Sequence, residues 1–470
     1  MLAMKKNMLD ENDILDNLRQ QRVLIVGLGA TGLSCVRFLS RHGIEVAVTD
    51  SRARPPGLDV LQKELPDIAV FVGGFEAEAF VRADVLLLSP GVALYEPLVA
   101  EARVRGAEVI GDVELFARLV SEPVIAITGS NGKSSVTTLV GMMAEAAGRD
   151  VAVAGNIGTP VLDLLNDKHN LYVLELSSFQ LETTGSLETV AATILNLSED
   201  HMDRYASLAD YSAAKARIFH GSNTLIINND DPRVRATLEM LGTGHGLIHF
   251  SLREPANGDF GLCEHKAGDW LCVGTESGSK PLIAVKKLPV RGRHNLANAL
   301  AALALGQAAG LPMKAMLTAL KAFTGLAHRC QWLGEFQGIN WYNDSKATNV
   351  GAAMAAIEGL EAEKVVLIAG GQGKGQDFSS LTDIVSQRAR AVLLMGEDAA
   401  KIKAVLSASV KTVQVKNMKE AVNRAAELAQ VGDAVLLSPA CASFDMFRGF
   451  EARGDAFIQQ VKLQMEPQIK

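Results

Sequence analysis

Short apolar runs alternate with amphipathic stretches along most of this chain. In the first quarter, four runs rich in valine, isoleucine and leucine predict buried strands, at 22–26, 45–50, 83–89 and 108–110. Apolar positions at helical spacing predict two helices between them, at 31–41 and 95–105. Strands that alternate with helices favour a parallel sheet with helices on both faces.

The same alternation continues through the rest of the chain. Further strands are predicted at 123–127, 151–154, 171–176, 191–196 and 224–228. A hairpin and two helices follow, at 260–265 with 270–274 and at 294–309 and 313–323. A last set of strands is predicted at 364–369, 391–395 and 434–438. We therefore divide the chain into three α/β domains, 1–110, 111–325 and 326–470.

Composition narrows the class of protein. The chain has 470 residues and a formal net charge of −7 without a basic stripe, which argues against a nucleic-acid-binding protein. Five scattered cysteines without C-x-x-C spacing predict reduced thiols, not a disulfide framework or a zinc site. The N-terminal residues lack the apolar run of a signal peptide, and no apolar stretch is long enough for a membrane span. We therefore expect a cytoplasmic protein without a membrane span.

A glycine-rich turn, Gly129-Ser-Asn-Gly-Lys-Ser-Ser135, lies between a predicted strand and a helical stretch at 136–147. Free backbone N–H groups and the helix dipole form an anion site there. Lys133 would reach terminal phosphates, and the Ser134 hydroxyl would bind Mg²⁺. Ile127 stands where the full Walker pattern has glycine, and a tight turn without a ligand is the alternative. The order of Gly, Lys and Ser favours a phosphate-binding loop that uses ATP or GTP.

A second glycine-rich turn, Gly27-Leu-Gly-Ala-Thr-Gly32, follows the first predicted strand. Asp50 ends the next strand, at the distance typical of a dinucleotide-binding fold. An NAD-dependent dehydrogenase is one interpretation. The same turn can hold any diphosphate at a helix N-terminus, so the motif alone leaves the ligand open.

Polar side chains follow two central strands. Glu175 ends one strand and is a candidate Mg²⁺ ligand, because hard cations prefer oxygen ligands; a solvated surface carboxylate is the alternative. His201 follows the next strand, beside two acids, and is a candidate metal ligand or acid–base group; a structural histidine is the alternative. Both lie at the sheet edge where α/β proteins bind ligands.

Lys215 lies on a predicted helix that begins with a capping box, Ser207 to Asp210. It shares one helical face with Leu208, Tyr211 and Ile218, which places it on the inward stripe. Burial would lower its pKa, and the neutral amine could react with CO₂ to give a carbamate that binds metal. A lysine whose ammonium group reaches out to solvent is the alternative, favoured by spacing alone.

The last region also carries polar motifs after its predicted strands. They include Arg329, Asp344, Lys346 and Thr348, a glycine-rich loop with Lys374, and the end of the final strand with Ser443 and Phe444. They would converge on one crevice, and the lysines would suit an acidic substrate. Cys441 is interpreted as a buried small apolar residue, not a nucleophile.

Taken together, these motifs resemble those of the Mur ligases, over about residues 23–454. The resemblance rests on the phosphate-binding loop, Gly155-Asn-Ile-Gly158, Leu174-Glu-Leu-Ser-Ser-Phe-Gln180, Glu199-Asp-His-Met-Asp-Arg-Tyr205, Ala213-Ala-Lys-Ala-Arg217, Asn343-Asp-Ser-Lys-Ala-Thr-Asn349 and Pro439-Ala-Cys-Ala-Ser443. Ser135 departs from the usual Thr of these ligases but keeps the hydroxyl. Residues before Arg22 have no counterpart in the resemblance.

The resemblance implies a fold and a ligand for each domain. The first is expected to be Rossmann-like and to bind the UDP of a nucleotide sugar through Thr31, Asp50, Ser51, Arg52 and Gly91. The second is expected to be P-loop-ATPase-like with a mixed sheet, and to bind ATP. The nucleotide-binding residues it implies are Gly129, Ser130, Asn131, Gly132, Lys133, Ser134, Ser135, Asn295, Asn298, Arg329 and Asp344. The third is expected to be Rossmann-like and to hold D-glutamate through Lys346, Thr348, Lys374, Ser443 and Phe444.

The resemblance also implies the chemistry. Two Mg²⁺ ions would be held by Ser134, Glu175, His201 and a carbamylated Lys215. Asn156 would contact the acyl end of the sugar substrate, and the catalytic set would be Lys133, Asn156, His201 and Lys215. The expected reaction is the ATP-dependent addition of D-glutamate to UDP-N-acetylmuramoyl-L-alanine through an acyl phosphate, in peptidoglycan precursor synthesis, by a monomer.

Four other functions stay open on the sequence. A sibling ligase would add a different amino acid, although the Asp344-Ser-Lys-Ala-Thr348 run favours an acidic one. A folate polyglutamylating ligase shares the architecture, but the motifs around His201 and Ser443 point away from it. A dehydrogenase would bind NAD. A non-catalytic regulator would bind ATP without releasing ADP.

Overall fold

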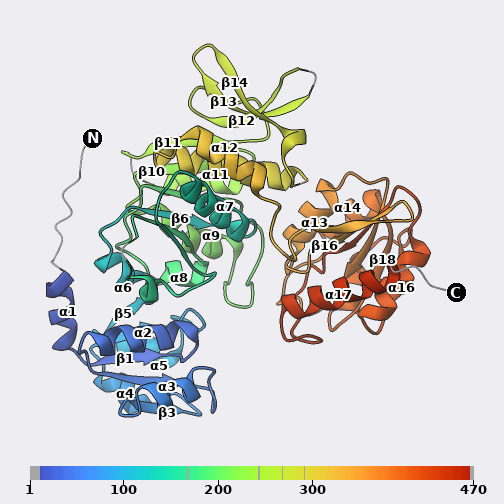
Figure 1. The fold of residues 1–470 in the computed structure, drawn as a ribbon. Helices are drawn as coiled ribbons and strands as arrows, with labels where there is room; N and C mark the ends of the chain where they lie inside the picture. The colour runs from blue at the N-terminus through green and yellow to red at the C-terminus, as the bar shows by residue number, and fades with distance from the viewer. Residues whose placement is uncertain are drawn as a thin grey trace.

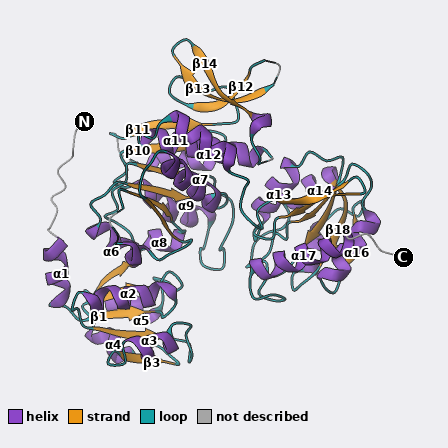
Figure 2. Ribbon diagram, viewed as in Figure 1, coloured by secondary structure: helices purple, strands orange, loops and turns teal. Residues whose placement is uncertain are grey.

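A computed structural model describes residues 11–465 except 166, 168, 242, 243, 267 and 291. It contains three sheets that follow one another along the chain, which we call the N-terminal, central and C-terminal units (Figure 1). Figure 2 shows helices on either side of each sheet. None of the helices within the described ranges has both the length and the apolar character needed to cross a membrane.

The N-terminal unit is a parallel sheet in the order β3-β2-β1-β4-β5. Its strands are β1 (Val23–Val26), β2 (Val46–Asp50), β3 (Ala69–Val72), β4 (Val85–Leu88) and β5 (Glu108–Gly111). Its helices are α2 (Ala30–Arg41), α3 (Leu58–Glu64), α4 (Ala77–Arg82) and α5 (Pro97–Val104). The central strands β1 and β4 are buried at every position, which explains their continuous apolar runs.

The central unit has nine strands in the order β14-β13-β12-β11-β10-β9-β6-β8-β7. They are β6 (Val124–Thr128), β7 (Val151–Gly155), β8 (Leu171–Glu175), β9 (Ala191–Ile194), β10 (Thr224–Asn228), β11 (Gly246–Phe250), β12 (Phe260–Glu264), β13 (Asp269–Thr275) and β14 (Gly278–Ala284). Strands β12, β13 and β14 pair antiparallel and the others parallel, so the predicted hairpin and the mixed sheet are confirmed. In Figure 1 this antiparallel part projects from the molecule.

Helices cover both faces of the central sheet. They are α6 (Asp112–Leu119), α7 (Lys133–Ala146), α8 (Ser178–Glu182), α9 (Leu208–Ala216), α10 (Pro232–Thr237), α11 (Arg293–Ala308) and α12 (Met313–Ala322). Short 3₁₀ turns lie at η1 (Val161–Leu164), η2 (Arg217–Phe219), η3 (Leu238–Met240) and η4 (Val285–Lys287). The predicted helix that carries Lys215 is therefore confirmed, with its last turn in 3₁₀ form.

The C-terminal unit is a six-stranded sheet in the order β15-β16-β20-β17-β18-β19. Its strands are β15 (Gln331–Phe336), β16 (Ile339–Asn343), β17 (Val365–Ala369), β18 (Ala389–Leu394), β19 (Lys411–Gln414) and β20 (Ala434–Leu437). Its helices are α13 (Val350–Gly359), α14 (Leu381–Arg388), α15 (Ala399–Val405), α16 (Met418–Leu428) and α17 (Phe450–Met465). Only β15 runs antiparallel to its neighbour, so the predicted doubly wound α/β pattern is confirmed.

The units differ in how their cores connect. One continuous apolar cluster runs from the α2 side of the N-terminal sheet to the central sheet, and it includes Leu15 and Leu18 of α1 (Glu11–Arg19). The two apolar clusters of the C-terminal sheet contain only residues of that unit. The first two units therefore share a core, whereas the third is held to them by other contacts.

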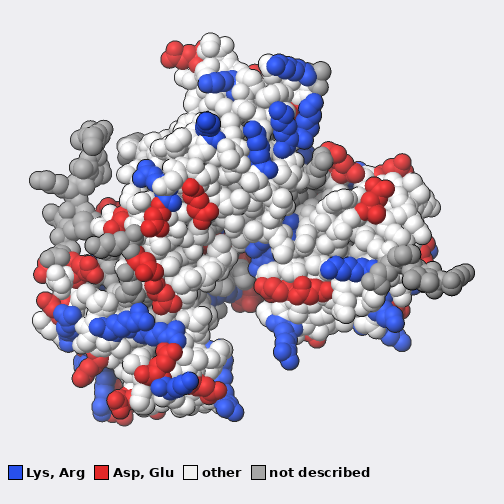
Figure 3. Space-filling model, viewed as in Figure 1, with Lys and Arg blue, Asp and Glu red and all other residues white. Residues whose placement is uncertain are grey.

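The surface carries charges of both signs. On the face in Figure 3, acidic and basic side chains are interspersed over the N-terminal and C-terminal units.

One prediction about the cysteines is wrong. Cys263 and Cys272 form a disulfide, where the sequence predicted reduced thiols. The antiparallel register pairs Gly261 with Cys272 and Cys263 with Trp270, so the two cysteines are diagonal neighbours with Cα atoms 6.0 Å apart. Spacing along the chain could not show this pairing. Cys35, Cys330 and Cys441 are free.

Candidate active site

The phosphate-binding loop, residues 129–135, joins β6 to α7 as predicted. Gly129 and Gly132 have φ of 149° and 83°, and Gly132 caps α7. A Cβ at Gly132 would lie 2.5 Å from the side-chain oxygen of Asn298, so this position needs glycine. The Asn131 N–H donates to the Asn196 side chain over 2.8 Å. The loop is therefore a preformed turn at a helix N-terminus.

Two side chains of this loop have partners that a phosphate could replace. Lys133 Nζ donates to the carbonyls of Gly129 and Ser130, at 2.7 and 3.0 Å, and burial lowers its pKa. Ser134 Oγ accepts a hydrogen bond of 2.7 Å from Arg329 of the C-terminal unit. The lysine thus folds over the loop, where an anion would lie.

Glu175 ends β8 and faces the same space. Its side chain is 1% exposed, so the alternative of a solvated surface carboxylate is wrong. Oε1 accepts a hydrogen bond of 2.7 Å from Asn156, whereas Oε2 is buried and has no hydrogen-bond partner within the described residues. A buried carboxylate oxygen without a partner is costly, which makes it a natural ligand for a cation.

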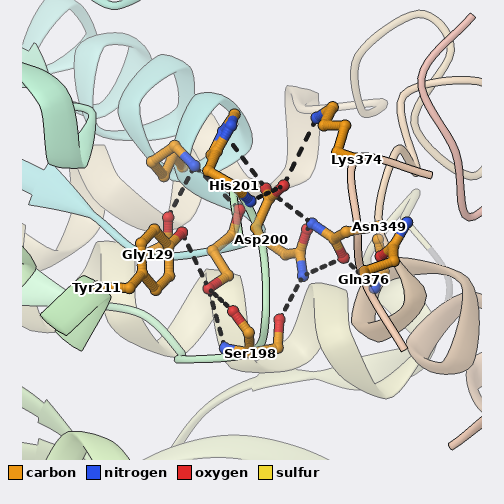
Figure 4. Close-up of polar contacts among 12 residues, drawn as sticks. Gly129, Ser198, Asp200, His201, Tyr211, Asn349, Lys374 and Gln376 are labelled. Carbon is orange, nitrogen blue, oxygen red and sulfur yellow. Dashed lines mark hydrogen bonds and ion pairs between the residues drawn. The ribbon is translucent and has the colours of Figure 1, made fainter. Parts of the chain in front are cut away.

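His201 and Asp200 lie beside the loop (Figure 4). His201 has φ of 58°, a left-handed conformation that turns the chain directly after Asp200. Burial lowers the pKa of His201, which favours the neutral imidazole. Asp200 accepts a hydrogen bond of 3.1 Å from Asn349 and lies 3.6 Å from Lys374 Nζ, so it contacts two residues of the C-terminal unit.

Lys215 is buried, with 1% of its surface exposed. The alternative of an ammonium group that reaches solvent is therefore wrong. Nζ donates to Thr128 Oγ1 over 3.2 Å and lies 4.7 Å from the centre of the Tyr211 ring. Burial, followed by the nearby Lys133 charge, lowers the pKa of Lys215 well below its usual value. The neutral amine that the carbamate hypothesis requires is therefore favoured.

The C-terminal unit closes a cavity of about 310 Å³ over these groups. Its lining combines Lys133, Ser134, Asn156, Glu175, His201 and Lys215 with Arg329, Lys346, Thr348, Lys374, Ser443 and Phe444. The predicted set of phosphate, metal and amino-acid residues is thus brought together. Phe444 is 70% exposed at the rim, whereas Lys346 lies 4.1 Å from the ring centre of Phe450, which the sequence analysis missed.

A second cavity, of about 390 Å³, adjoins the first and shares Asn131, Gly132, Arg329 and Lys346 with it. Ser135, Asn295, Asn298 and Asp344 line it, as predicted for one nucleotide site. Burial raises the pKa of Asp344 to about 7, and the carboxylate accepts hydrogen bonds from Ser438 Oγ and the Cys330 N–H. The two cavities thus adjoin along the phosphate-binding loop, which contributes Asn131 and Gly132 to both.

The residues predicted for the nucleotide sugar lie apart from both cavities. Thr31, Ser51 and Gly91 lie near the carboxyl ends of β1, β2 and β4. Asp50 accepts hydrogen bonds from the Leu28 N–H at 2.7 Å and from the Arg52 side chain at 2.6 Å. These contacts order the edge of the N-terminal sheet, and a ligand there stays a prediction.

Three residues at the site were given no role by the sequence analysis. They are Asp200, Asn349 and Arg204. All three stand inside motifs quoted above, so position in a motif is the signal that could have found them. Arg204 contacts residues more than a hundred positions away, and no local pattern signals that contact.

Family comparisons agree with this geometry. The chain matches the model of a Mur ligase MurD-like N-terminal domain at residues 21–111. It also matches models of the Mur ligase middle domain at 127–306 and the Mur ligase glutamate ligase domain at 328–441. The three models follow one another along the chain in the same order as the three sheets.

Two relatives resemble nearly the whole chain. A UDP-N-acetylmuramoylalanine–D-glutamate ligase of Nitrosococcus oceani is 55% identical over 93% of this chain and 96% of its own. The protein of that name from Pseudomonas aeruginosa is 52% identical over 93% and 97%.

Solved structures share the fold. A pseudomurein peptide ligase type C from Methanothermus fervidus has a TM-score of 0.59 at 18% identity, over 94% of this chain and all of that one. A UDP-N-acetylmuramate–alanine ligase from Thermotoga maritima has a TM-score of 0.57 at 17% identity, over 94% and 100%.

Proposed function

The chain belongs to the Mur ligase family, and on that premise we propose that it joins D-glutamate to the L-alanyl carboxylate of UDP-N-acetylmuramoyl-L-alanine while ATP becomes ADP and phosphate. The protein is an ATP-dependent ligase of peptidoglycan precursor synthesis. The printed names of the relatives supply the two substrates. The observation that carries the proposal is the cavity in which the phosphate-binding loop, buried Glu175 and Lys215, and Lys346 and Lys374 meet.

We assign one ligand to each domain. Residues 1–110 would bind the UDP sugar, 111–325 ATP, and 326–470 D-glutamate. The adjoining cavities support the last two assignments, because Asn295, Asn298 and Asp344 line the space next to the phosphate-binding loop. We propose a monomer as the working unit. ATP and a nucleotide sugar as substrates make the cytoplasm the compartment we propose.

The residues around Glu175 fit magnesium. Mur ligases use ATP and Mg²⁺. The unpartnered Glu175 oxygen, the neutral His201 imidazole and the Ser134 hydroxyl would hold the metal. A second site would use a carbamate on Lys215: its neutral amine adds to CO₂, an N–C bond forms, one proton leaves, and two oxygens become available as ligands. When bound, Mg²⁺ neutralises charge on the phosphates.

The chain's own groups account for orientation and exclusion of water. Lys133 would turn from its carbonyl partners to the terminal phosphate, which the substrate carboxylate accepts to give an acyl phosphate. Asn156 would hold the acyl end beside Glu175. Lys346, Thr348, Lys374, Ser443 and Phe444 would place D-glutamate so that its amine attacks the acyl carbon and phosphate leaves. The C-terminal unit over the cavity would keep water from the acyl phosphate.

The release of ADP tests this proposal. The purified chain is incubated with UDP-N-acetylmuramoyl-L-alanine, ATP, Mg²⁺ and one amino acid at a time. We expect release that depends on D-glutamate and does not occur with L-glutamate. Release with another amino acid would make the chain a sibling ligase. Binding of ATP without release in any mixture would favour a regulator and overturn the proposal.

A further inference from the structure

Arg204 is a partly buried arginine between the N-terminal and central units, and the proposed function gives it no role. Its side chain is 11% exposed. Nη1 donates to the carbonyl of Pro90 over 2.8 Å, and Nη2 donates to the carbonyl of Val92 over 3.2 Å. Nη2 also pairs with Glu182 at 2.9 Å. The guanidinium therefore binds both carbonyls that flank Gly91.

Two residues of the central unit, Phe179 and Glu182, fix the guanidinium. The Arg204 guanidinium carbon lies 4.1 Å from the ring centre of Phe179, which is on α8 together with Glu182. Glu182 also accepts a hydrogen bond of 2.5 Å from the Tyr205 hydroxyl. The planar group is thus paired, stacked and held in place before it meets the N-terminal unit.

The same turn carries His201. The backbone N–H groups of Arg204 and Tyr205 both donate to the His201 carbonyl, at 2.9 and 3.1 Å. The Phe179 ring packs edge-on to the His201 ring, with centres 4.8 Å apart. Arg204 therefore has a fixed position relative to a predicted metal ligand.

In the N-terminal unit, the Pro90–Val92 loop lies against the glycine-rich turn at 27–32. Ser89 Oγ donates to the Gly27 carbonyl over 2.8 Å, and a Cβ at Gly27 would lie 2.9 Å from the Ser89 Cβ. Both turns lie at the carboxyl edge of the sheet, where α/β folds bind ligands. Arg204 thus joins the predicted nucleotide-sugar site to the turn of His201, which lines the cavity of about 310 Å³, called the phosphate cavity below.

We propose that Arg204 is a positioning residue that holds the Pro90–Val92 loop against the His201 turn, so that a UDP sugar bound to the N-terminal unit presents its carboxylate at the phosphate cavity. This inference rests on the proposed function. The planar guanidinium group of arginine can bind two carbonyls and a carboxylate at once. The single ammonium group of a lysine would bind only some of these three partners.

Arg204→Lys is the test, because it keeps a cation beside Glu182 and removes the fork. We expect the KM for UDP-N-acetylmuramoyl-L-alanine to rise about tenfold, as for the loss of one charge-assisted hydrogen bond. The KM values for ATP and D-glutamate should stay within about twofold, since Arg204 contacts neither proposed site. If the single variant does not fold, the pair Arg204→Gln with Glu182→Gln leaves no buried charge unpaired and gives the same comparison.

Arg217→Lys is the matched control. Arg217 donates to the carbonyls of Leu181 and Thr184, at 2.6 and 2.7 Å. Like Arg204, it therefore donates from its guanidinium to two backbone carbonyls at the end of α8. Both of these hydrogen bonds stay within the central unit. Its KM values should match those of the wild type. Equal profiles for the two variants, or a parallel rise in all three KM values for Arg204→Lys, would overturn the proposal.

A binding measurement separates this proposal from the proposed function. Calorimetric titration of the full chain with UDP-N-acetylmuramoyl-L-alanine alone needs no turnover. Arg204→Lys should weaken binding about tenfold relative to the wild type and to Arg217→Lys. Unchanged affinity contradicts the role of Arg204, whereas absence of D-glutamate-dependent ADP release by the wild type contradicts the proposed function.

Discussion

At the scale of single residues, the cavity brings basic side chains together with the carboxylates of Glu175 and Asp200, so basic groups outnumber acidic ones. Lys133, Lys215, Arg329 and Lys346 line one cavity, and burial lowers the pKa of each, that of Lys346 to about 8. Such a group is costly unless phosphates and carboxylates arrive to pair with it. This electrostatic imbalance fits a site that binds ATP and acidic substrates together.

Lys133→Ala should nearly abolish turnover. The substitution removes the cation that would neutralise the transferred phosphoryl group, and we expect kcat to fall roughly 100- to 1000-fold. Initial rates of ADP release measure the effect. Lys419→Ala, on the exposed side of α16, is the control and should keep the wild-type rate. A Lys133→Ala enzyme with more than half the wild-type rate would contradict the assigned role.

Lys215→Ala should also be inactive, with partial rescue by formate or acetate. The lysine is buried, so a short carboxylic acid could occupy the space of the side chain and replace the carbamate oxygens. Rates of ADP release are compared with and without each acid, and Lys133→Ala should not respond to them. Full activity of Lys215→Ala without added acid would show that no carbamate is needed.

At the scale of elements, strand ends were more predictable than the contacts between them. The buried strands β1 and β17 are apolar throughout, and β6 is apolar up to Thr128, so their continuous apolar runs located them. The edge strands β3 and β19 are short and largely exposed, and their sequences lack a buried-strand signal. The sequence predicted which polar residues follow strands, and the fold brought them together.

The contacts that the sequence did not predict mostly join residues far apart along the chain. The ion pair of Lys374 with Asp200 and the bonds of Arg204 to Pro90 and Val92 join residues from different units. Periodicity and motif spacing describe neighbours along the chain, so they carry no information about such pairs. The Cys263–Cys272 disulfide was missed for a different reason: the predicted hairpin contains both cysteines, but its register, which makes them diagonal neighbours, was not part of the prediction.

Helix α6 carries a buried acid that makes stability depend on pH. Burial raises the pKa of Asp112 to about 6 from its ordinary value of 3.8. The folded state therefore holds this proton more tightly than the unfolded state. The stabilisation from protonated Asp112 is fully present below the pKa of the unfolded state, and it is lost as the pH rises through the pKa of the folded state. Asn resembles the protonated acid, so Asp112→Asn should stabilise the protein most at high pH.

Urea unfolding at pH 5 and pH 8 checks this prediction. We expect Asp112→Asn to raise the free energy of unfolding by about 3 kcal/mol at pH 8, at about 1.4 kcal/mol per unit of pKa, and by less at pH 5. Asp383→Asn, exposed on α14, is the control and should change stability little at either pH. A variant that is less stable than the wild type at pH 8 would show that the Asp112 carboxylate contributes more than its burial costs.

At the scale of the whole molecule, the C-terminal unit meets the central unit through polar contacts near the site. Asn349 exchanges hydrogen bonds of 3.2 and 3.3 Å with Asn131 and donates to Asp200. Arg329 donates to Ser134. No apolar core cluster of buried residues spans this boundary among the described residues, so such bonds, together with the packing of α13 against α11, hold the unit over the cavity.

Asn349→Asp should therefore loosen the C-terminal unit without loss of its own helix cap. Asn349 caps α13, and aspartate caps helices equally well, but it would place a carboxylate against Asp200. We expect a larger radius of gyration by small-angle X-ray scattering and a roughly tenfold lower kcat, as for a misplaced reacting group. Adding Asp200→Asn should restore the compact form. An unchanged radius would show that this contact does not hold the unit.

The central claim is that the substrate carboxylate is activated as an acyl phosphate in this site. It is tested most directly by labelling the L-alanyl carboxylate of UDP-N-acetylmuramoyl-L-alanine with a heavy oxygen isotope and analysing the released phosphate by mass spectrometry. With ATP and D-glutamate present, we expect each released phosphate to carry one oxygen from the carboxylate. Phosphate that carries no labelled oxygen, while ADP is released, would contradict it.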